Sequence, residues 1–410
     1  MQFKRWNDIC LCAERDLFPA DAVSVEQPFA PLVFLVHRDG KTCRGLYAVS
    51  SLQEVGEEES LRCLLPVADS DEDTDLSRFV AKNGATVLNT AFQNGFSVLQ
   101  QYLTPKRGGY RVTLVGLGDV GGTVLTGLKL LGHEIDEIAI FDPNTALCDR
   151  YEMELNQVLQ AEDGKPLPRV TVCREEALFD CDLFIFTATR GVPPLGTQVR
   201  DVRMAQFDAN RAMLEAYALK ARQAQFKGLF CQVSDPVDHL ARAVFLRSNC
   251  DDSGAYDGCG LLPEQVQGFG LGVMAARAAY YAGKEDVDFS QGRAYGPHGQ
   301  GLVVANCPDD GYDDALSCRL TELTGTANLR VRDLGFKPYI APGLSSAAVS
   351  ILRLLRGEDH YGAVPLNGAY FGCTSRMTWQ GIKLYRESIC KELLKRLEET
   401  HHQLRAFDYT

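Results

Sequence analysis

The chain has 410 residues, of which 45% are hydrophobic and 23% charged, and its formal net charge is −12. This composition is typical of a soluble globular protein with two or three domains, and it excludes disorder, collagen-like structure and coiled coil as the main state. An acidic chain without a basic block lacks the positive surface that binds nucleic acid or an anionic membrane. We therefore expect neither as a partner.

The cysteines indicate a reducing compartment. There are 14 of them, too few for a disulfide scaffold in a chain of this length, and none forms a C-x-x-C pair. Residues 1–16 carry charge where a signal peptide needs an apolar core, and no run of 18 apolar residues occurs. We therefore expect a cytoplasmic protein with reduced thiols and no bound metal.

The first hundred residues predict a small α+β unit. Residues 31–49 predict two strands joined as a hairpin around Asp39-Gly40, because Asp-Gly between apolar runs favours a tight turn. An acidic loop follows at 69–75, and residues 76–103 predict a helix. The segment 106–109, KRGG, is typical of a linker, so we place a domain boundary near residue 105.

From residue 111 strands alternate with helices, which predicts a doubly wound parallel sheet covered on both faces. The predicted strands are 111–118, 137–142, 169–173, 182–189 and 228–234, and the helices are 120–132, 146–160, 204–225 and 236–248. After residue 250 the pattern is mixed, with helices at 271–282 and 387–404 and strands near 301–306 and 368–373. We expect an N-terminal α+β domain at 1–105, a dinucleotide-binding domain at 106–250 and an α+β substrate domain at 251–410.

A glycine-rich turn joins the first strand and helix of the predicted parallel sheet. Gly116, Gly118 and Gly121 match G-x-G-x-x-G, and Asp142 ends the next strand 26 residues after Gly116. Glycines at these positions permit a tight turn, a close approach of pyrophosphate to the helix N-terminus, and close packing of helix on strand. A carboxylate at Asp142 accepts hydrogen bonds from ribose hydroxyls and repels a 2′-phosphate. The motif therefore predicts NAD rather than NADP.

From about residue 111 to the C-terminus, the chain resembles the lactate/malate dehydrogenase family. The segments that carry this resemblance are VTLVGLGDVGGTV (112–124), CDLFIFTATRG (181–191), DAN (208–210), CQVSDPVDHL (231–240), GFGLGVMAARAAY (268–280) and GPHGQG (296–301). The resemblance implies hydride transfer between a nicotinamide ring and a 2-hydroxy or 2-oxo acid, with a small carboxylate as substrate and a homo-oligomer as the assembly. Residues 1–105 lie outside it.

The resemblance also assigns site residues. His298 matches the acid/base, Arg277 the arginine that binds the substrate carboxylate, and Arg203, seven residues before Asn210, the arginine of a mobile loop. Arg190 and Arg200 are alternatives for that loop arginine. The residues implied in cofactor binding are Gly116, Gly118, Asp119, Val120, Gly121, Asp142, Thr187, Ala188, Asn210 and Val233.

Two positions depart from the family pattern. Met274 stands where the family has the Asp that orients its catalytic His, and Asp235-Pro236 replaces Asn-Pro. In one interpretation Asp235 supplies the missing carboxylate to His298 and takes part in catalysis. In another, the chain is a catalytically impaired NAD(H)-binding regulatory protein. A third is an NAD- and metal-dependent glycosidase with Cys231 as a ligand, for which no partner ligand is evident.

Overall fold

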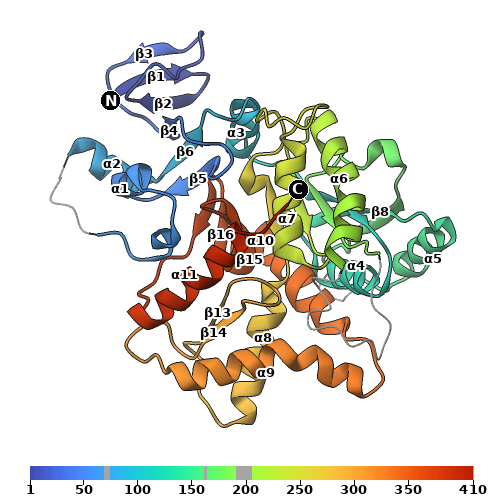
Figure 1. Ribbon diagram of the computed structural model, residues 1–410. Coiled ribbons are helices and arrows are strands. Elements are labelled where there is room, and N and C mark those ends of the chain that lie inside the picture. Colours follow the sequence, from blue (N-terminus) through green and yellow to red (C-terminus); the bar gives the residue numbers. More distant parts are fainter. Residues whose placement is uncertain (69–73, 161–163, 191–205, 410) are drawn as a thin grey trace.

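One continuous sheet organises the chain. The computed structural model describes residues 1–68, 74–160, 164–190 and 206–409. In this part of the chain 15 strands pair in the order β3-β1-β2-β4-β6-β5-β17-β16-β15-β12-β11-β10-β7-β8-β9. Figure 1 shows the N-terminal strands at one end of the molecule and the β8 end of the sheet at the other.

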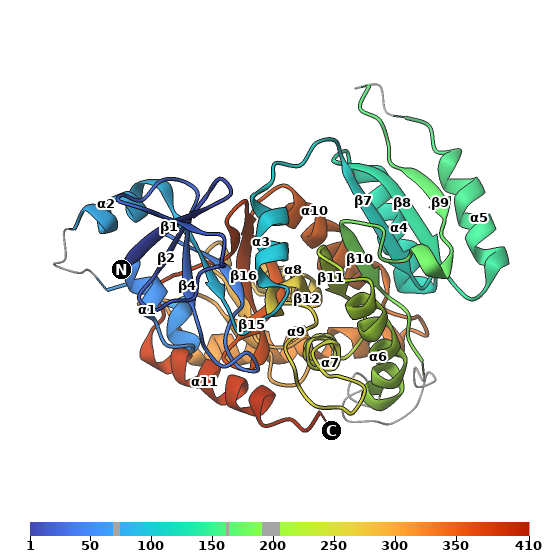
Figure 2. The ribbon, with the colours of Figure 1, turned by 90° about the horizontal axis from the view of Figure 1, so that it is seen from above.

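Six parallel strands form the doubly wound part, and β7, β8 and β9 lie side by side in Figure 2. From β9 to β12 their order is β9-β8-β7-β10-β11-β12, so the winding reverses between β7 and β10. This arrangement confirms the predicted α/β class. The strands are β7 (Tyr110–Val115), β8 (Ile135–Phe141), β9 (Arg169–Val172), β10 (Leu183–Phe186), β11 (Leu229–Gln232) and β12 (Val266–Gly268).

Both faces of these strands are buried under helices. In β10, Phe184 and Phe186 belong to one hydrophobic cluster, whereas Leu183 and Ile185 belong to another on the opposite face. Because strand side chains alternate between faces, a strand covered on both sides is apolar throughout. The covering helices are α4 (Asp119–Leu131), α5 (Thr145–Asn156), α6 (Phe207–Gln223) and α7 (Val237–Ser248), and Pro236 is the N-cap of α7.

The predicted N-terminal hairpin is wrong. Strands β4 (Leu32–Val36) and β5 (Leu46–Val49) do not pair, because β6 (Ala85–Asn89) lies between them. The single helix predicted over 76–103 is also wrong: β6 separates α2 (Asp75–Asn83) from α3 (Gly95–Leu103). All five residues of β6 are buried, so tertiary burial decides a segment that its local pattern leaves ambiguous.

The C-terminal part returns to the N-terminal strands. Strand β17 pairs with β5 through Ile382 and Tyr47, and Glu264 accepts hydrogen bonds from the amides of Gly45 and Leu46 at 3.0 Å. The division into three domains stays a prediction. Strand β17 is Gly381–Leu384, and the remaining helices and strands are β1 (Gln2–Trp6), β2 (Ile9–Ala13), β3 (Val23–Val25), α1 (Leu52–Gly56), α8 (Leu271–Lys284), β13 (Arg293–Tyr295), β14 (Val303–Ala305), α9 (Asp314–Asp333), a π-helix (Pro342–Val349), α10 (Ser350–Leu355), β15 (His360–Leu366), β16 (Ala369–Thr378) and α11 (Lys391–Arg405).

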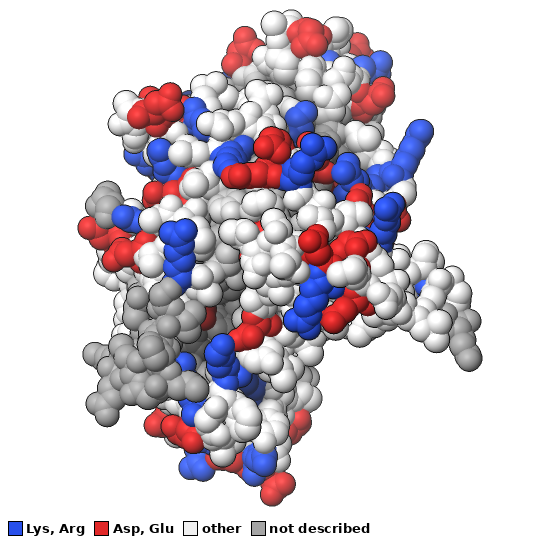
Figure 3. All heavy atoms as spheres, turned by 90° about the vertical axis from the view of Figure 1, so that its right-hand side faces the viewer, with Lys and Arg blue, Asp and Glu red and all other residues white. Residues whose placement is uncertain are grey.

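The surface is charged with both signs. Figure 3 shows basic and acidic side chains interspersed over one face of the molecule. Among the helices of the described residues, none is both long and apolar enough to span a bilayer.

Candidate active site

A cavity of about 420 Å³ opens at the carboxyl ends of the parallel strands. Residues that follow four of these strands line it: Gly118 after β7, Thr187 after β10, Val233 after β11 and Phe269 after β12. Ligands of doubly wound sheets bind at this edge, where the strand order reverses. Helices α8 and α9 and the 337–346 segment supply the remaining wall.

The glycine-rich turn is held from both sides. Gly116 has a φ of +94°, and Leu117 donates its backbone N–H to Asp142 at 2.9 Å. The Thr187 hydroxyl donates to the Gly116 carbonyl at 2.6 Å. A Cβ at Gly121 would lie 1.8 Å from that carbonyl oxygen, so only glycine permits this packing. Gly116, Gly121 and Asp142 therefore shape the turn, and they are not among the residues that line the cavity.

The N-terminus of α4 faces the cavity. Gly118 is its N-cap, and a Cβ there would meet no atom within 4 Å. Free backbone N–H groups and the helix dipole favour an anion at such a position. Asp119 in the first turn pairs with Lys337 at 2.9 Å, which offsets the repulsion that its carboxylate exerts on an anion.

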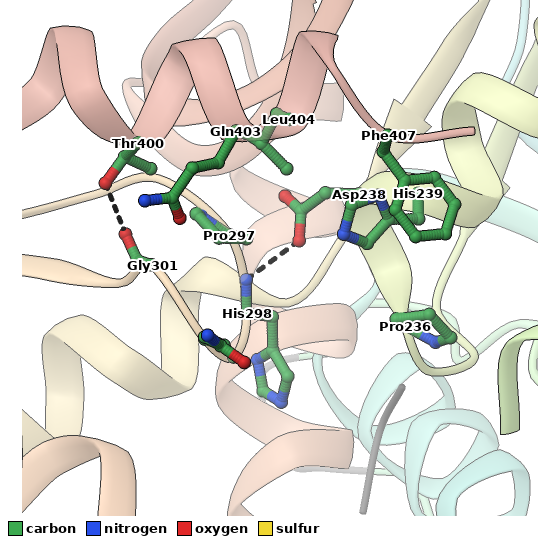
Figure 4. A pocket seen from close by; sticks show the side chains of 12 residues that line it. Pro236, Asp238, His239, Pro297, His298, Gly301, Thr400, Gln403, Leu404 and Phe407 are labelled. Atoms are coloured by element: carbon green, nitrogen blue, oxygen red, sulfur yellow. Dashed lines mark hydrogen bonds between the residues drawn. The ribbon is translucent and has the colours of Figure 1, made fainter. Parts of the chain in front are cut away.

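His298 sits in an anchored loop between β13 and β14. Gly296 and Gly301 have φ values of +78° and +91°, and Thr400 donates to the Gly301 carbonyl at 3.0 Å. The His298 backbone N–H donates to Asp238 at 2.8 Å (Figure 4). Helices α7 and α11 thus fix the loop that presents the imidazole.

The imidazole of His298 has a defined tautomer. Its Nδ1 lies 2.5 Å from the Gly270 carbonyl oxygen, and since a carbonyl only accepts, Nδ1 carries the proton. Its Nε2 lies 3.8 Å from Asp235 Oδ1. The residue is 7% exposed and lines the cavity. The nitrogen able to exchange a proton with a ligand is therefore Nε2, beside a carboxylate.

A backbone carbonyl takes the orienting position. The Gly270 oxygen also accepts from the Ser346 hydroxyl at 2.6 Å, and Ser346 in turn accepts from the Val273 amide at 2.9 Å. A Cβ at Gly270 would lie 2.5 Å from His298 Cβ. Met274 is fully buried on α8, one turn before Arg277. The carbonyl fixes the tautomer as a carboxylate would, but it brings no negative charge to Nδ1.

Asn210 connects the two loops beside His298. It is fully buried, donates to the Asp235 carbonyl at 2.7 Å and accepts the Arg190 backbone N–H at 2.6 Å. The Ser234 hydroxyl donates to the Ala188 carbonyl at 2.6 Å. Asn210 and Ala188 therefore set the cavity wall from behind it.

The structure brings most predicted residues together. Arg277 lines the cavity from α8, across from the strand ends. Arg190 has an exposed side chain, and Arg200 and Arg203 lie outside the described residues. Of the predicted residues, those that line the cavity are Gly118, Asp119, Val120, Thr187, Val233, Asp235, Arg277 and His298.

Sequence reasoning missed part of the wall. Asn328, Arg332, Lys337, Tyr339 and Ser346 line the cavity, but no motif singles them out. The described residues contain no group of three or more His, Cys, Asp or Glu able to hold a metal. Cys231 is fully buried within β11, and this burial raises the pKa of its thiol.

Curated proteins that are similar to the chain include lactate and malate dehydrogenases. L-lactate dehydrogenase of Mesomycoplasma hyopneumoniae is 27% identical over 200 residues, which cover 48% of this chain and 57% of that enzyme. Malate dehydrogenase of Sulfurimonas denitrificans is 26% identical over 282 residues, 64% of this chain and 81% of that enzyme. The matched region spans little more than half the length of the lactate dehydrogenases, and no protein-family model matches the chain.

Solved structures agree on the fold. A minor L-lactate dehydrogenase from Enterococcus mundtii in ligand-bound form superposes with a TM-score of 0.58 and 19% identity, over 73% of this chain and 98% of that one. Malate dehydrogenase from Archaeoglobus fulgidus in complex with NADH superposes with a TM-score of 0.59 and 17% identity, over 72% of this chain and 97% of that one. The chain is thus similar in sequence to lactate and malate dehydrogenases, and it shares their fold over nearly three quarters of its length.

Proposed function

We propose that this chain is an NAD-dependent oxidoreductase that transfers a hydride between nicotinamide and a 2-hydroxy or 2-oxo acid. The observation that carries the proposal is the placement of His298 and Arg277 in one cavity with the N-terminus of α4. An acid/base, a carboxylate-binding fork and an anion site then face the same space. The relatives named above are enzymes of this class.

The glycine-rich turn fits a dinucleotide. Open space at Gly118 and the first amides of α4 would hold the pyrophosphate, and Asp142 at the end of β8 would bind the ribose. Thr187 and Val233 line the route from this turn to His298. When bound, NADH supplies the hydride. Asp142 makes NAD rather than NADP the expected cofactor.

His298 is the proton donor for reduction of a 2-oxo acid. The Gly270 carbonyl holds Nδ1–H, so the proton that moves to the substrate oxygen comes from Nε2. The charged imidazole exists only before this transfer, and Asp235 at 3.8 Å stabilises it. Asp235 thereby acts on the Nε2 side of the ring. The carboxylate that Met274 replaces would act on the Nδ1 side.

Arg277 binds the substrate carboxylate. A guanidinium presents two parallel N–H groups to a planar carboxylate, which fixes the position of C2 relative to His298. Arg203 is our candidate for the loop arginine that polarises the substrate oxygen, with Arg190 and Arg200 as alternatives. We further propose three domains at 1–105, 106–250 and 251–410, a cytoplasmic location and a homo-oligomeric assembly.

Oxidation of NADH with a panel of 2-oxo acids tests the function. We expect turnover with one class of acid and saturable NADH binding. Tight NADH binding without turnover on any acid would favour the regulatory alternative instead. Absence of NADH binding would contradict both.

Gly118→Ala separates cofactor binding from folding. The new Cβ meets no protein atom but occupies the space where pyrophosphate approaches α4. Such overpacking costs about 1–3 kcal/mol, so we expect the Kd for NADH to rise roughly 5- to 150-fold with an unchanged Tm. Fluorescence titration and thermal melting measure the two. The control is Gly283→Ala on α8, where a Cβ also meets open space but lies outside the cavity. This variant keeps the wild-type affinity for NADH.

Asp235→Asn tests the carboxylate beside His298. Loss of the charge destabilises the imidazolium, so the acidic form of His298 requires a lower pH and the kcat profile for reduction shifts to lower pH. We expect kcat at neutral pH to fall by roughly tenfold, the effect of about one pKa unit. Stopped-flow rates from acid to alkaline pH measure this. An unchanged rate and profile would remove Asp235 from the mechanism.

A further inference from the structure

A second cavity, of about 830 Å³, lies at the opposite ends of the parallel strands. Tyr110 at the start of β7, Asp182 just before β10 and Gly228 just before β11 line it. The cavity that contains His298, which we call the catalytic cavity, opens at the other ends of these strands and shares none of these residues. We call this second cavity the rear cleft.

The rear cleft is bounded by parts of the chain that are distant in sequence. Its walls come from α3 with Gln100 and Gln101, the 104–107 segment, the end of α10 with Leu355, and the turn between β16 and β17 with Trp379. Figure 2 shows the chain after α3 passing over to β7. Small-molecule sites favour such junctions, and their volumes are typically about 300–1,000 Å³.

Positive charge gathers in the rear cleft of an otherwise acidic protein. The basic residues in its lining are Lys106, Arg107, Lys227 and Arg356, and the acidic one is Asp182. Asp182 pairs with Lys106 at 2.8 Å, and Glu134 pairs with Arg356 at 2.8 Å. Arg107 and Lys227 have exposed side chains and no ion pair with any described residue. Two cations without an ion-pair partner in one cleft favour an anion such as phosphate.

An exposed indole lines the same cleft. Trp379 is 55% exposed although it is among the largest apolar side chains of the protein. Its ring and the Met377 side chain offer an apolar surface on which a flat aromatic group can stack. The amides of Gln100 and Gln101 supply hydrogen-bond donors and acceptors at α3.

We propose that the rear cleft binds a small ligand that carries both an aromatic ring and a phosphate group, with the size of a mononucleotide. Trp379 stacks on the ring, and Arg107 and Lys227 bind the phosphate. This site is separate from the catalytic cavity and does not depend on the proposed oxidoreductase activity.

Tryptophan fluorescence tests the site, because the chain has only two tryptophans. Trp6 lies in β1 and packs on Phe96 of α3, away from Trp379 in the sequence. The substitution Trp6→Phe therefore leaves Trp379 as the sole indole. In this background ADP alone is the probe, because Trp379 lines the rear cleft and not the cavity that contains His298. We expect saturable quenching by ADP. Adenosine and pyrophosphate, which each carry one half of the recognised chemistry, bind more weakly than ADP.

Charge variants assign the contacts. Arg107→Ala with Lys227→Ala raises the Kd for ADP by about 10- to 100-fold, the usual effect of losing charged hydrogen bonds. Lys395→Ala, an exposed cation on α11 outside the rear cleft, leaves it unchanged. No quenching at millimolar ADP, adenosine or pyrophosphate binding as tightly as ADP, or an unchanged Kd in the double variant would each overturn the proposal.

Discussion

His298→Ala lowers kcat for the reduction of a 2-oxo acid by about 10²–10⁴-fold, the usual contribution of a positioned acid/base. The alanine cannot supply the proton that Nε2 carries, whereas the glycine-rich turn that would hold the dinucleotide is untouched. Steady-state oxidation of NADH measures kcat, and fluorescence titration shows an NADH affinity near the wild-type value. The bell-shaped or sigmoid dependence of kcat on pH is lost with the imidazole.

His402→Ala is the matched control for this substitution. His402 has an exposed side chain on α11 and lies outside the catalytic cavity, so its loss leaves kcat unchanged. Equal rates in His298→Ala and the wild-type protein would contradict the assignment of His298. A loss of NADH binding together with turnover would instead indicate that the loop between β13 and β14 had collapsed.

Arg277→Lys reduces kcat/KM by about 10²–10³-fold, mainly through KM. Lysine keeps the positive charge but presents a point charge instead of a planar fork, so one of two charged hydrogen bonds to the carboxylate and its geometry are lost. Hydrogen bonds to charged groups contribute about 1.5–3 kcal/mol each, and misplacement of C2 relative to His298 adds to this effect. Initial rates over a range of acid concentrations separate KM from kcat.

The matched control is Arg319→Lys. Arg319 is 65% exposed on α9, where it pairs with Glu285, and it does not line the cavity. A substitution there leaves KM unchanged. A wild-type KM in Arg277→Lys would show that the carboxylate binds elsewhere in the cavity, for example on α9 or the 337–346 segment.

Around His298 a backbone carbonyl takes the orienting role that the family pattern gives to an aspartate. Met274 is buried and cannot accept the imidazole N–H as a carboxylate does. The Gly270 carbonyl does so, and Ser346 fixes that peptide from the other side. A neutral acceptor preserves the ring orientation, while the charge lies at Asp235 beside Nε2. The sequence showed the departure but not the acceptor, because a backbone carbonyl leaves no trace in residue type.

The sequence by itself determined the doubly wound sheet and the glycine-rich turn, because both depend on local patterns: apolar runs of strand length, helical periodicity, and glycines at fixed spacing. The resemblance to the lactate/malate dehydrogenase family, and not such a pattern, made His298, Arg277 and Asp235 candidates. The N-terminal region shows the limit. A short apolar run such as β6 has the same composition in a helix or a strand, and only its burial between β4 and β5 decides.

Only the tertiary structure decided which distant residues meet. Asp235 and His298 are far apart in the sequence, and their 3.8 Å separation depends on how α7, α8 and the β13–β14 loop pack on the ends of the sheet. The same holds for Asn328, Lys337 and Ser346 in the catalytic cavity and for Trp379, Arg107 and Lys227, which all line the rear cleft. Side-chain periodicity determines which face of a helix or strand is buried. Which other element packs on that face depends on the tertiary structure, and a local sequence pattern does not predict it.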